Sequence, residues 1–316
     1  MNKNTKQSSK KITICVCTYN NYSLLFSCIQ RLSIQSVYKD KYDVLILDNS
    51  PEKFLEKSVG CKKLCDSLDN FTYVAKLTDG LSGARNECID LVNTELIHFI
   101  DDDAMVDFDF VKNTIDCFLR HDNLAIMGGK VIPSWGGVKR PNWLCDDALG
   151  YLSMLDFGDS EMWYSENEGM WLVGANICFR RTCLVKYGKF SNKLGRKGWS
   201  KSLLGSEEMQ LIYKMGNKEK ILYNPTSVVN HVVPENRMNQ AWFIKRVAWQ
   251  AVSDVMTDTF YMENAGEWSD NKFGYDFLKE NSEILYEETN DPDIFCKKLK
   301  VAKMLSFWML NDFKTK

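Results

Sequence analysis

The chain has 316 residues, of which 45% are hydrophobic, and it carries a formal net charge of −2 at pH 7. This length and composition suffice for one large folded domain, or for a domain with an extension. The nearly balanced charge gives no electrostatic reason to expect a nucleic-acid partner. No apolar run approaches the roughly 20 residues that a membrane-spanning helix needs.

The first residues and the cysteines indicate a cytoplasmic protein. The first eleven residues are polar and rich in lysine, unlike a signal peptide, and residues 1–10 are expected to form a flexible tail. The eleven cysteines are scattered, and the chain has only three histidines. This pattern argues against a zinc site and favours reduced thiols.

Strands and helices are predicted to alternate along the first hundred residues. Short β-branched and apolar runs predict buried parallel strands, and apolar residues at helical spacing predict helices between them. The predicted strands cover residues 12–17, 44–47, 71–75 and 95–100, and the predicted helices cover residues 24–34 and 80–92. This alternation implies a mostly parallel sheet wrapped by helices on both faces.

Polar residues follow three of these strands at the point where each strand ends. Residues 18–20 come after the first strand, Asp48 ends the second, and residues 101–103 come after the fourth. In parallel sheets, ligands bind beyond the carboxyl ends of the strands. The three polar ends therefore predict one shared nucleotide-type site, whereas Asp48 alone is also typical of a helix cap.

Three consecutive aspartates, Asp101, Asp102 and Asp103, end the fourth predicted strand. Strand side chains alternate between faces, so Asp101 and Asp103 should point one way and Asp102 the other. Adjacent carboxylates repel one another unless a cation or hydrogen-bond donors neutralise them. Mg²⁺ and Mn²⁺ are the ions that suit such oxygen ligands, while a solvated acidic turn is the alternative.

The second half of the chain has a less regular pattern. Residues 133–144 are rich in Trp and Gly and predict a loop, while residues 171–180 predict an interrupted strand. A helix is predicted over residues 206–215, with Ser206 as its N-cap and two acids in its first turn. Short strands are predicted at residues 221–223 and 228–231, and helices from residue 240 onward.

Seven polar motifs follow one another along residues 11–237. They are Thr18-Tyr19-Asn20, Asp48-Asn49-Ser50, Gly83-Ala84-Arg85-Asn86, Asp101-Asp102-Asp103, Gly174-Ala175-Asn176 with Arg180-Arg181, Glu207-Glu208, and His231. Each motif is weak alone, but in this order they resemble the family 2 glycosyltransferases of the GT-A fold. The resemblance implies an α/β, Rossmann-like, mixed and mostly parallel sheet sandwiched by helices over residues 11–237. Residues 238–316 would form a helical C-terminal extension.

The resemblance implies an inverting transfer of a sugar from a nucleotide-diphosphate donor to a hydroxyl acceptor, assisted by Mn²⁺ or Mg²⁺. A carboxylate that accepts from an imide N–H, as Asp48 could, suits uracil or thymine better than adenine, and the donor is expected to be a UDP-sugar. The expected acceptor is a glycan, a lipid-linked sugar or a protein, in the synthesis of a surface polysaccharide or glycoconjugate.

The resemblance also assigns roles to individual residues. It places these side chains at the nucleotide: Thr18, Tyr19, Asn20, Asp48, Arg85, Asp101 and Asp102. Asp103, the last residue of the family's DXD motif, would bind the metal, and in several relatives a histidine equivalent to His231 completes the shell. Alternatives from the residues alone are a structural ion pair for Arg85 and a satisfied buried histidine for His231.

Inversion requires a base on the face of the sugar opposite the leaving group. The resemblance favours Glu208 as this base and Glu207 as a support of the loop, although the family commonly has Asp in second place. A carboxylate at a helix N-terminus normally has a lowered pKa, which desolvation by a bound acceptor would counter. Two acids that merely complement the helix dipole are the alternative.

Three further segments carry patterns with two interpretations each. The basic loop 195–205 suits either a lid over the donor phosphates or a solvated turn. Residues 295–313 suit an amphipathic helix that lies on the inner face of a membrane, or one that packs on its own domain or on a partner in a homo-oligomer. Three tryptophans suit either acceptor walls or core packing: Trp135, Trp143 and Trp199.

Two other functions are compatible with strand-end acids. A nucleotidyltransferase acting on sugar phosphates normally begins with a Gly-rich, basic phosphate loop, which residues 18–20 lack. A non-catalytic glycan- or nucleotide-binding module has no need of acids at all the expected places, and here they are intact. Both alternatives are therefore less favoured than a glycosyltransferase.

Overall fold

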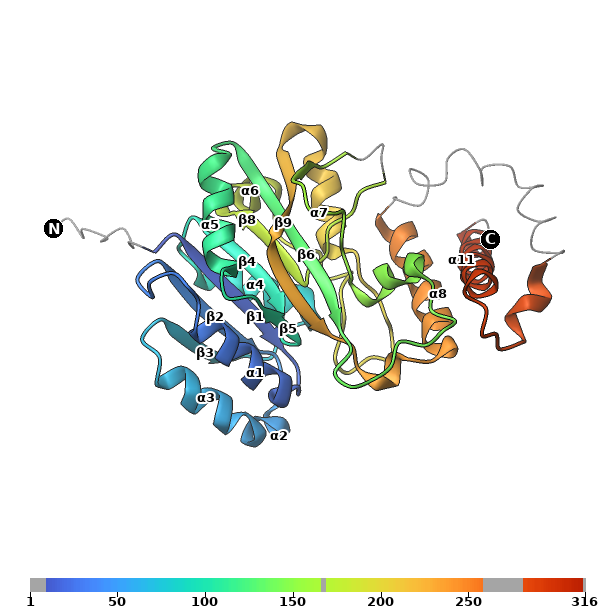
Figure 1. The fold of residues 1–316 in the computed structure, drawn as a ribbon, viewed down its shortest axis with the longest axis horizontal. Coiled ribbons are helices and arrows are strands. Elements are labelled where there is room, and N and C mark those ends of the chain that lie inside the picture. The colour runs from blue at the N-terminus through green and yellow to red at the C-terminus, as the bar shows by residue number, and fades with distance from the viewer. Residues whose placement is uncertain (1–9, 166–168, 258–280, 315–316) are drawn as a thin grey trace.

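The protein is built around a mixed sheet with the strand order β3-β2-β1-β4-β8-β6-β9-β5, with β7 beside β9 (Figure 1). A computed structural model describes residues 10–165, 169–257 and 281–314. The strands are β1 (Ile12–Thr18), β2 (Tyr42–Asp48), β3 (Phe71–Ala75), β4 (Leu96–Asp101), β5 (Ala104–Val106), β6 (Leu124–Ser134), β7 (Met162–Trp163), β8 (Asn176–Arg180) and β9 (Lys220–Val232). The predicted tail lies outside the described residues, apart from Lys10.

The first half of the sheet confirms the parallel βαβ pattern. Strand β1 pairs in parallel with β2 and β4, and β2 pairs in parallel with β3. All seven residues of β1 are buried, as expected for a central strand covered on both faces. Each of the four predicted strands exists, with ends displaced by no more than two residues.

The second half of the sheet differs from the predicted elements. Strand β8 runs antiparallel between β4 and β6, and residues 171–175, predicted as strand, are loop. Strand β9 is continuous where two short strands were expected, because its register against β6 jumps from Asn224 to Val228. Pro225 lies inside this bulge, where a residue without an N–H donor is tolerated. Strands β5 and β6 and helix α5 had no predicted counterpart, and β6 includes residues 133–134 of the expected loop.

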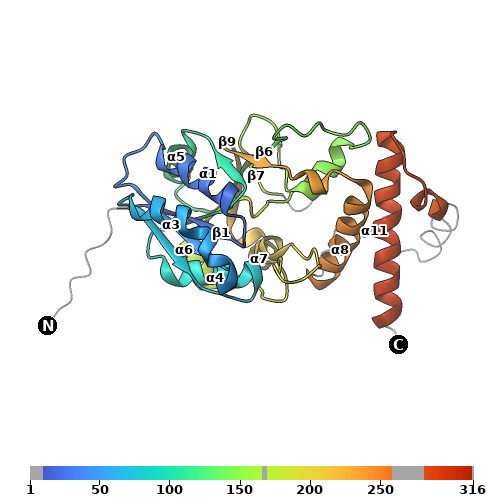
Figure 2. The same cartoon turned by 90° about the horizontal axis from the view of Figure 1, so that it is seen from below.

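Helices cover both faces of the sheet. Figure 2 shows α1 and α5 on one side and α4, α6 and α7 on the other. Within the described residues, the helices other than 3₁₀ turns are α1 (Tyr22–Ser33), α2 (Glu52–Leu55), α3 (Val59–Asp66), α4 (Gly80–Leu91), α5 (Phe110–Arg120), α6 (Arg181–Tyr187), α7 (Glu207–Met215), α8 (Gln240–Thr257) and α11 (Pro292–Lys314).

Neither Asp48 nor Ser206 caps a helix through its side chain, although Ser206 holds the expected N-cap position. Asp48 does not cap α2, which has Pro51 at its N-cap position and no side-chain cap hydrogen bond. Ser206 holds the N-cap position of α7, but its φ of +66° is left-handed and its hydroxyl makes no cap hydrogen bond. That hydroxyl instead accepts a hydrogen bond from Gln250 Nε2 at 2.9 Å, which ties the start of α7 to α8.

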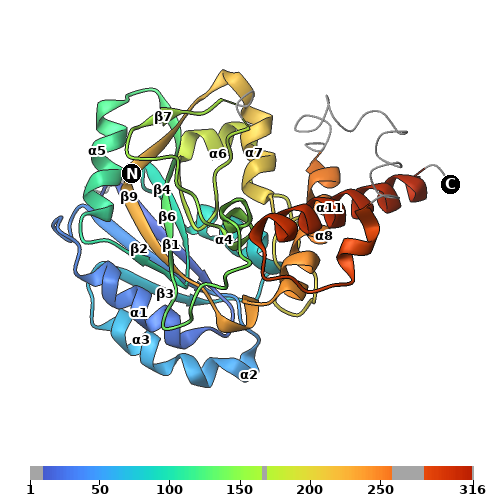
Figure 3. The same cartoon turned by 45° about the vertical axis from the view of Figure 1, so that its right-hand side comes forward.

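The C-terminal helices α8 and α11 lie side by side at one end of the sheet (Figures 2 and 3). Trp143 packs edge-on against Phe243 of α8 and Phe295 of α11, with ring centroids 5.6 and 4.6 Å apart. This contact corresponds to core packing, one of the two interpretations of Trp143. A disulfide joins Cys145 to Cys296, so the expectation of reduced thiols is wrong for this pair. The two cysteines are 151 residues apart, and no spacing pattern indicates that they meet.

The apolar face of α11 is used within the described chain. Leu299, Val301 and Phe307 are buried, and Lys303 forms an ion pair with Asp254 of α8 at 2.9 Å. Packing on its own domain therefore accounts for these residues, and contact with a membrane surface stays a prediction. Among the described residues, no helix combines the length and hydrophobicity required to span a bilayer.

Loss of the Cys145–Cys296 bond should lower the melting temperature of the protein. A disulfide that closes a loop of about 150 residues is worth roughly 2–5 kcal/mol, which corresponds to ~3–8 °C for a chain of this size. We expect dithiothreitol to lower the Tm by this amount in calorimetry. The Cys145→Ser/Cys296→Ser variant should have the lowered Tm already and be insensitive to dithiothreitol. An equal response of both proteins to the reductant would contradict the assignment.

Candidate active site

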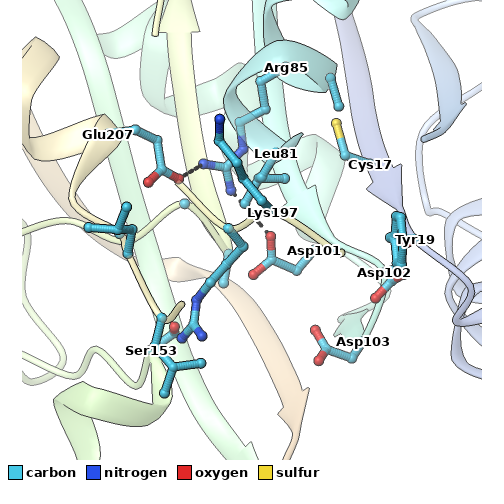
Figure 4. Close-up of a pocket in the computed structure, with 18 of the residues that line it drawn as sticks. Cys17, Tyr19, Leu81, Arg85, Asp101, Asp102, Asp103, Ser153, Lys197 and Glu207 are labelled. Atoms are coloured by element: carbon cyan, nitrogen blue, oxygen red, sulfur yellow. Dashed lines mark hydrogen bonds and ion pairs between the residues drawn. The ribbon is translucent and has the colours of Figure 1, made fainter. Parts of the chain in front are cut away.

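A cavity of about 430 Å³ lies beyond the carboxyl ends of β1 and β4 (Figure 4). Nine of the eleven site residues expected from the sequence line it, although they come from five separate segments of the chain. They are Thr18, Tyr19, Arg85, Asp101, Asp102, Asp103, Glu207, Glu208 and His231. The convergence of polar strand ends on one rim is therefore observed, while the role of each residue stays a prediction.

Asp48 and Asn20 do not line this cavity. Asp48 is fully buried, and its carboxylate accepts hydrogen bonds from Tyr22 Oη at 3.1 Å, Tyr73 Oη at 2.5 Å and the backbone N–H of Ser50 at 3.1 Å. Asn20 is exposed in a left-handed turn with φ of +53°. Asp48 would have to exchange a tyrosine hydroxyl for a base N–H before it contacted a nucleotide.

The three strand-end aspartates point to alternate sides, as predicted. Asp102 accepts hydrogen bonds from Thr18 Oγ1 at 2.6 Å and Asn21 Nδ2 at 2.8 Å. Asp101 and Asp103 face the opposite side, toward Arg85 and His231 respectively. Burial, with Asp103 adding to it, raises the pKa of Asp102 to about 8 despite the hydrogen bonds that Asp102 accepts. The strand end is thus a site of concentrated negative charge.

Asp101, Asp103 and His231 form a set that suits a divalent cation. One ligand atom from each lies within 4.8 Å of the other two. His231 Nε2 is 3.1 Å from Asp103 Oδ1, and this buried oxygen accepts no hydrogen bond. The pairing of β5 with β9 places Ala104 opposite His231, which brings the histidine beside the triad. Two carboxylates and an imidazole fit Mn²⁺, and the carboxylates also fit Mg²⁺.

The charges of Asp103 and His231 are coupled. Burial opposes ionisation of both groups, but their mutual attraction outweighs it, so the pKa of Asp103 is lowered and that of His231 is raised. The carboxylate of Asp103 therefore favours a proton on the His231 imidazole. A cation at the same place would replace that proton, since metal ligands must be deprotonated.

Arg85 joins the two sides of the cavity. In Figure 4 its guanidinium lies between Glu207 and Asp101, and the N–O distances are 2.5 Å to Glu207 Oε1 and 3.2 Å to Asp101 Oδ1. Burial alone would lower the pKa of Arg85. The charges of Glu207 and Asp101 raise this pKa by more, so the net shift is upward. A β-carbon at Gly174 would clash with the guanidinium, which explains a glycine there. These contacts correspond to a structural ion pair, which was the alternative to a nucleotide contact for Arg85.

Glu208 differs from Glu207 in having no cationic partner. Its Oε1 accepts a hydrogen bond from the N–H of Gly174 at 3.0 Å, and its Oε2 is buried without a partner. Burial, followed by the nearby charge of Glu207, raises the pKa of Glu208 to about 8, although Arg85 opposes this. The expectation of a lowered pKa at this helix N-terminus is therefore wrong, because desolvation outweighs the helix dipole even without an acceptor.

Three arginines line the cavity beyond the seven motifs, and the sequence pointed to only one of them, Arg196 of the basic loop. Arg196 lies in the loop 195–205, Arg237 follows β9, and Arg246 lies on α8. None of them forms an ion pair with a described carboxylate within 4.0 Å. Burial, and then repulsion from Arg246 and Arg237, lowers the pKa of Arg196 to about 9. The chain beyond residue 237 shows no recognisable motif. The sequence signal for Arg237 and Arg246 is a weak one, namely that both follow His231 in the chain.

The loop 195–205 is docked against the cavity. The carbonyl of Arg196 accepts a hydrogen bond from the N–H of Leu81 at 2.8 Å, and Lys197 Nζ is 2.8 Å from Asp79 Oδ1. A β-carbon at Gly198 would lie 2.5 Å from the ring of Tyr19, so the loop backbone covers the tyrosine face closely. The loop therefore sits where a lid over the donor would sit.

Replacing Arg85 with Met should strongly destabilise the protein. Loss of the guanidinium leaves Glu207 buried without its ion partner, which costs roughly 3–5 kcal/mol in such pairs. Urea unfolding measures this free energy, and the added change Glu207→Leu should recover part of the loss. Lys112→Gln, which breaks an exposed ion pair with Asp116, is the control and should leave the free energy of unfolding unchanged. Strictly additive losses in the double variant would show that the two residues are not coupled.

The sequence of this chain is similar to those of known glycosyltransferases. The model of the family described as Glycosyl transferase family 2 matches residues 13–172. The glucosyl-dolichyl phosphate glucuronosyltransferase of Haloferax volcanii is 25% identical over 271 residues, which span 84% of this chain and 82% of that protein. The succinoglycan biosynthesis protein ExoM of Rhizobium meliloti is 24% identical over 236 residues, or 74% of this chain and 71% of ExoM.

Solved structures share the fold. The mannosyltransferase PcManGT from Pyrobaculum calidifontis, in complex with GDP-Man and Mn²⁺, superposes with a TM-score of 0.61 at 15% identity, covering 97% of this chain and 88% of PcManGT. Residues 1–349 of S. aureus TarS give a TM-score of 0.52 at 13% identity, with coverage of 94% and 89%. Together with the family match, which spans half of the chain, these likenesses confirm the predicted class. The chain belongs to glycosyl transferase family 2 and is a glycosyltransferase of the GT-A fold.

Proposed function

We propose that this glycosyltransferase transfers a sugar with inversion from a UDP-sugar to a hydroxyl group of a glycan or lipid-linked acceptor, with Mn²⁺ or Mg²⁺ as its metal. One observation carries the proposal. A cation-binding set of Asp101, Asp103 and His231 shares a cavity with Glu208, a carboxylate that no cation neutralises. Inverting transfer needs these two parts, a place for the leaving diphosphate and a base.

The donor nucleotide would lie over the ends of β1 and β4. Thr18 and Tyr19 would contact the base and Asp102 the ribose, while Asp48 supports uracil only if Tyr22 or Tyr73 releases it. Arg196 and Arg237 line the same cavity without carboxylate partners, so they would face the phosphates. Closure of the loop 195–205 over the donor would exclude water from the reacting bond.

Asp103 and His231 would hold the metal, with Asp101 within reach of it. A bound divalent cation supplies neutralisation of the charge that develops on the departing diphosphate. PcManGT, which shares the fold, was solved with GDP-Man and Mn²⁺, and this supports a divalent cation here. The residues of this chain contribute two carboxylates, of which Asp103 is buried and Asp101 partly buried, and an imidazole fixed by the β5–β9 pairing.

Glu208 would act as the base. As the acceptor oxygen forms its bond to the anomeric carbon, the bond from that carbon to the diphosphate breaks on the opposite face. The acceptor proton passes to Glu208 Oε2, which has no other partner. Glu207 would act through Arg85, which it holds in place, and so position the helix that carries the base.

The names of the relatives support the class of product. One relative is a glucuronosyltransferase that acts on a glucosyl-dolichyl phosphate, and the other takes part in succinoglycan biosynthesis. Both make glycoconjugates or polysaccharides. We therefore propose a glycan or lipid-linked acceptor ahead of a protein, and a place at the inner face of a membrane if the acceptor is lipid-linked.

Replacing Asp103 with Asn should remove the metal-dependent binding of nucleotide. In the wild type, UDP with Mn²⁺ should raise the melting temperature, because a ligand that binds only the native state stabilises it. The variant should keep its far-UV spectrum but lose both this shift and turnover. Asp109→Asn, an exposed aspartate on the same segment, is the control. A full Mn²⁺-dependent shift in the Asp103 variant would remove this residue from the metal site, and a shift with GDP but not UDP would overturn the choice of donor.

Replacing Glu208 with Gln should lower kcat by about 10²–10⁴, the range typical of a lost general base, with little change in UDP affinity. For the wild type, kcat/KM should rise with pH through a limb near 8, since Glu208 works ionised and its pKa is raised to about 8. The limb should vanish in the variant and persist in Glu235→Gln, an exposed control. A limb that survives in Glu208→Gln would place the base elsewhere.

A further inference from the structure

A second cavity of about 250 Å³ adjoins the first. Its walls come from the 3₁₀ helix η2 (Asp146–Leu152), the segment 171–173, and helices α7, α8 and α11. Four residues line both cavities: Ser153, Ser206, Glu208 and Arg246. Because Glu208 stands at this border, whatever fills the second cavity reaches the carboxylate that we propose as the base.

Aromatic side chains line the second cavity. Trp171, Tyr151 and Tyr213 contribute to its walls, and Trp171 is 40% exposed. Phe157 and Trp171 meet in a T-shaped contact with ring centroids 5.3 Å apart, which supports the indole. A half-exposed indole held in one orientation offers an apolar face to the C–H groups of a sugar ring. The size and lining of this cavity therefore suit one sugar residue.

Arg246 is a cation of this cavity that has no anionic partner within ion-pair distance among the described residues. Its Nε and Nη1 atoms are buried without a hydrogen-bond partner, and none of the described carboxylates lies within ion-pair distance of it. The ionisable groups that face it are Tyr151, Asp254, Glu208 and Glu207. Asp254 is already engaged, since its carboxylate oxygens lie 2.6 Å from Gln250 Nε2 and 2.9 Å from Lys303 Nζ.

An unpaired buried guanidinium is costly, and a carboxylate or phosphate is the partner that relieves the cost best. The donor diphosphate has other cations available, because Arg196 and Arg237 line only the first cavity. Arg246 alone among these three arginines reaches the second cavity. Its position therefore indicates an anion on the acceptor side of Glu208.

We propose that the second cavity binds the acceptor sugar and that Arg246 selects acceptors carrying a negatively charged group next to that sugar. The inference rests on the proposed function in taking Glu208 as the base. Two sources share this chemistry, the carboxylate of a uronic acid and the phosphate that links a sugar to a lipid. Trp171 would hold the ring while Arg246 pairs with the anion, which turns one acceptor hydroxyl toward Glu208.

Calorimetric titration of the full chain, with and without UDP and Mn²⁺, tests this inference. The probes are methyl β-glucoside, methyl β-glucuronide and glucose 1-phosphate. At least one anionic probe should bind tenfold or more tightly than the neutral glucoside. A preference for the glucuronide identifies a carboxylate, and a preference for the phosphate identifies a sugar phosphate.

The Arg246→Gln variant should lose this preference, and Arg246→Lys should keep part of it. Lys245→Gln, an exposed change on the same helix, should keep all of it. Equal or undetectable binding of all three probes to the wild type overturns the inference, as does a preference that survives Arg246→Gln. A loss of UDP affinity in Arg246→Gln with the preference intact would assign Arg246 to the diphosphate. If the wild type binds UDP and Mn²⁺ but shows no preference, the proposed function stands and the inference alone fails.

Discussion

The ion pairs of Arg85 are the constraint on which the rest of the site depends. One guanidinium on α4 binds Asp101 at the end of β4 and Glu207 at the start of α7. These carboxylates belong to segments more than 100 residues apart, and one lies on the strand end proposed to bind the metal while the other precedes the proposed base. Arg85 and Glu207 are buried and Asp101 is partly buried, so charge fixes the distance between the two halves of the site.

This arrangement also explains why neighbouring carboxylates differ so much. Glu207 has its charge neutralised by Arg85, whereas Glu208, one residue later, has only a backbone N–H. Asp103 has His231 beside it, whereas Asp102 depends on Thr18 and Asn21. Local partners therefore separate like groups in one cavity: the pKa of Asp103 is lowered, whereas the pKa values of Asp102 and Glu208 are raised. Such separation of like groups is typical of acid–base catalysts.

The sequence predicted the parallel half of the sheet well because its strands are short apolar runs that end in polar residues. The positions of Asp101 to Asp103 followed from strand alternation, and the structure has them as expected. The bulged strand β9 was harder to predict, because a proline such as Pro225 normally indicates a break between two strands. The basic loop with Arg196 was noted, but Arg237 and Arg246 were missed, since they come from a strand exit and a helix whose meeting depends on tertiary packing.

The buried state of Asp48 was likewise invisible in the sequence. An aspartate after a strand is typical of a ligand contact or a cap, yet the hydroxyls of Tyr22 and Tyr73 occupy it. Nothing in the local spacing brings those tyrosines to it, because one comes from α1 and the other from β3. Motif order was thus a better guide to family than to the contacts of single residues.

The covalent link between Cys145 and Cys296 joins two walls of the second cavity, since η2 follows Cys145 directly and α11 contains Cys296. The spacing of those walls is therefore set by a bond as well as by the packing of Trp143 on Phe295. If the bond is reduced, the walls are held by aromatic packing and by the ion pair of Lys303 with Asp254. The redox state of the surroundings thereby bears on the cavity that we propose for the acceptor.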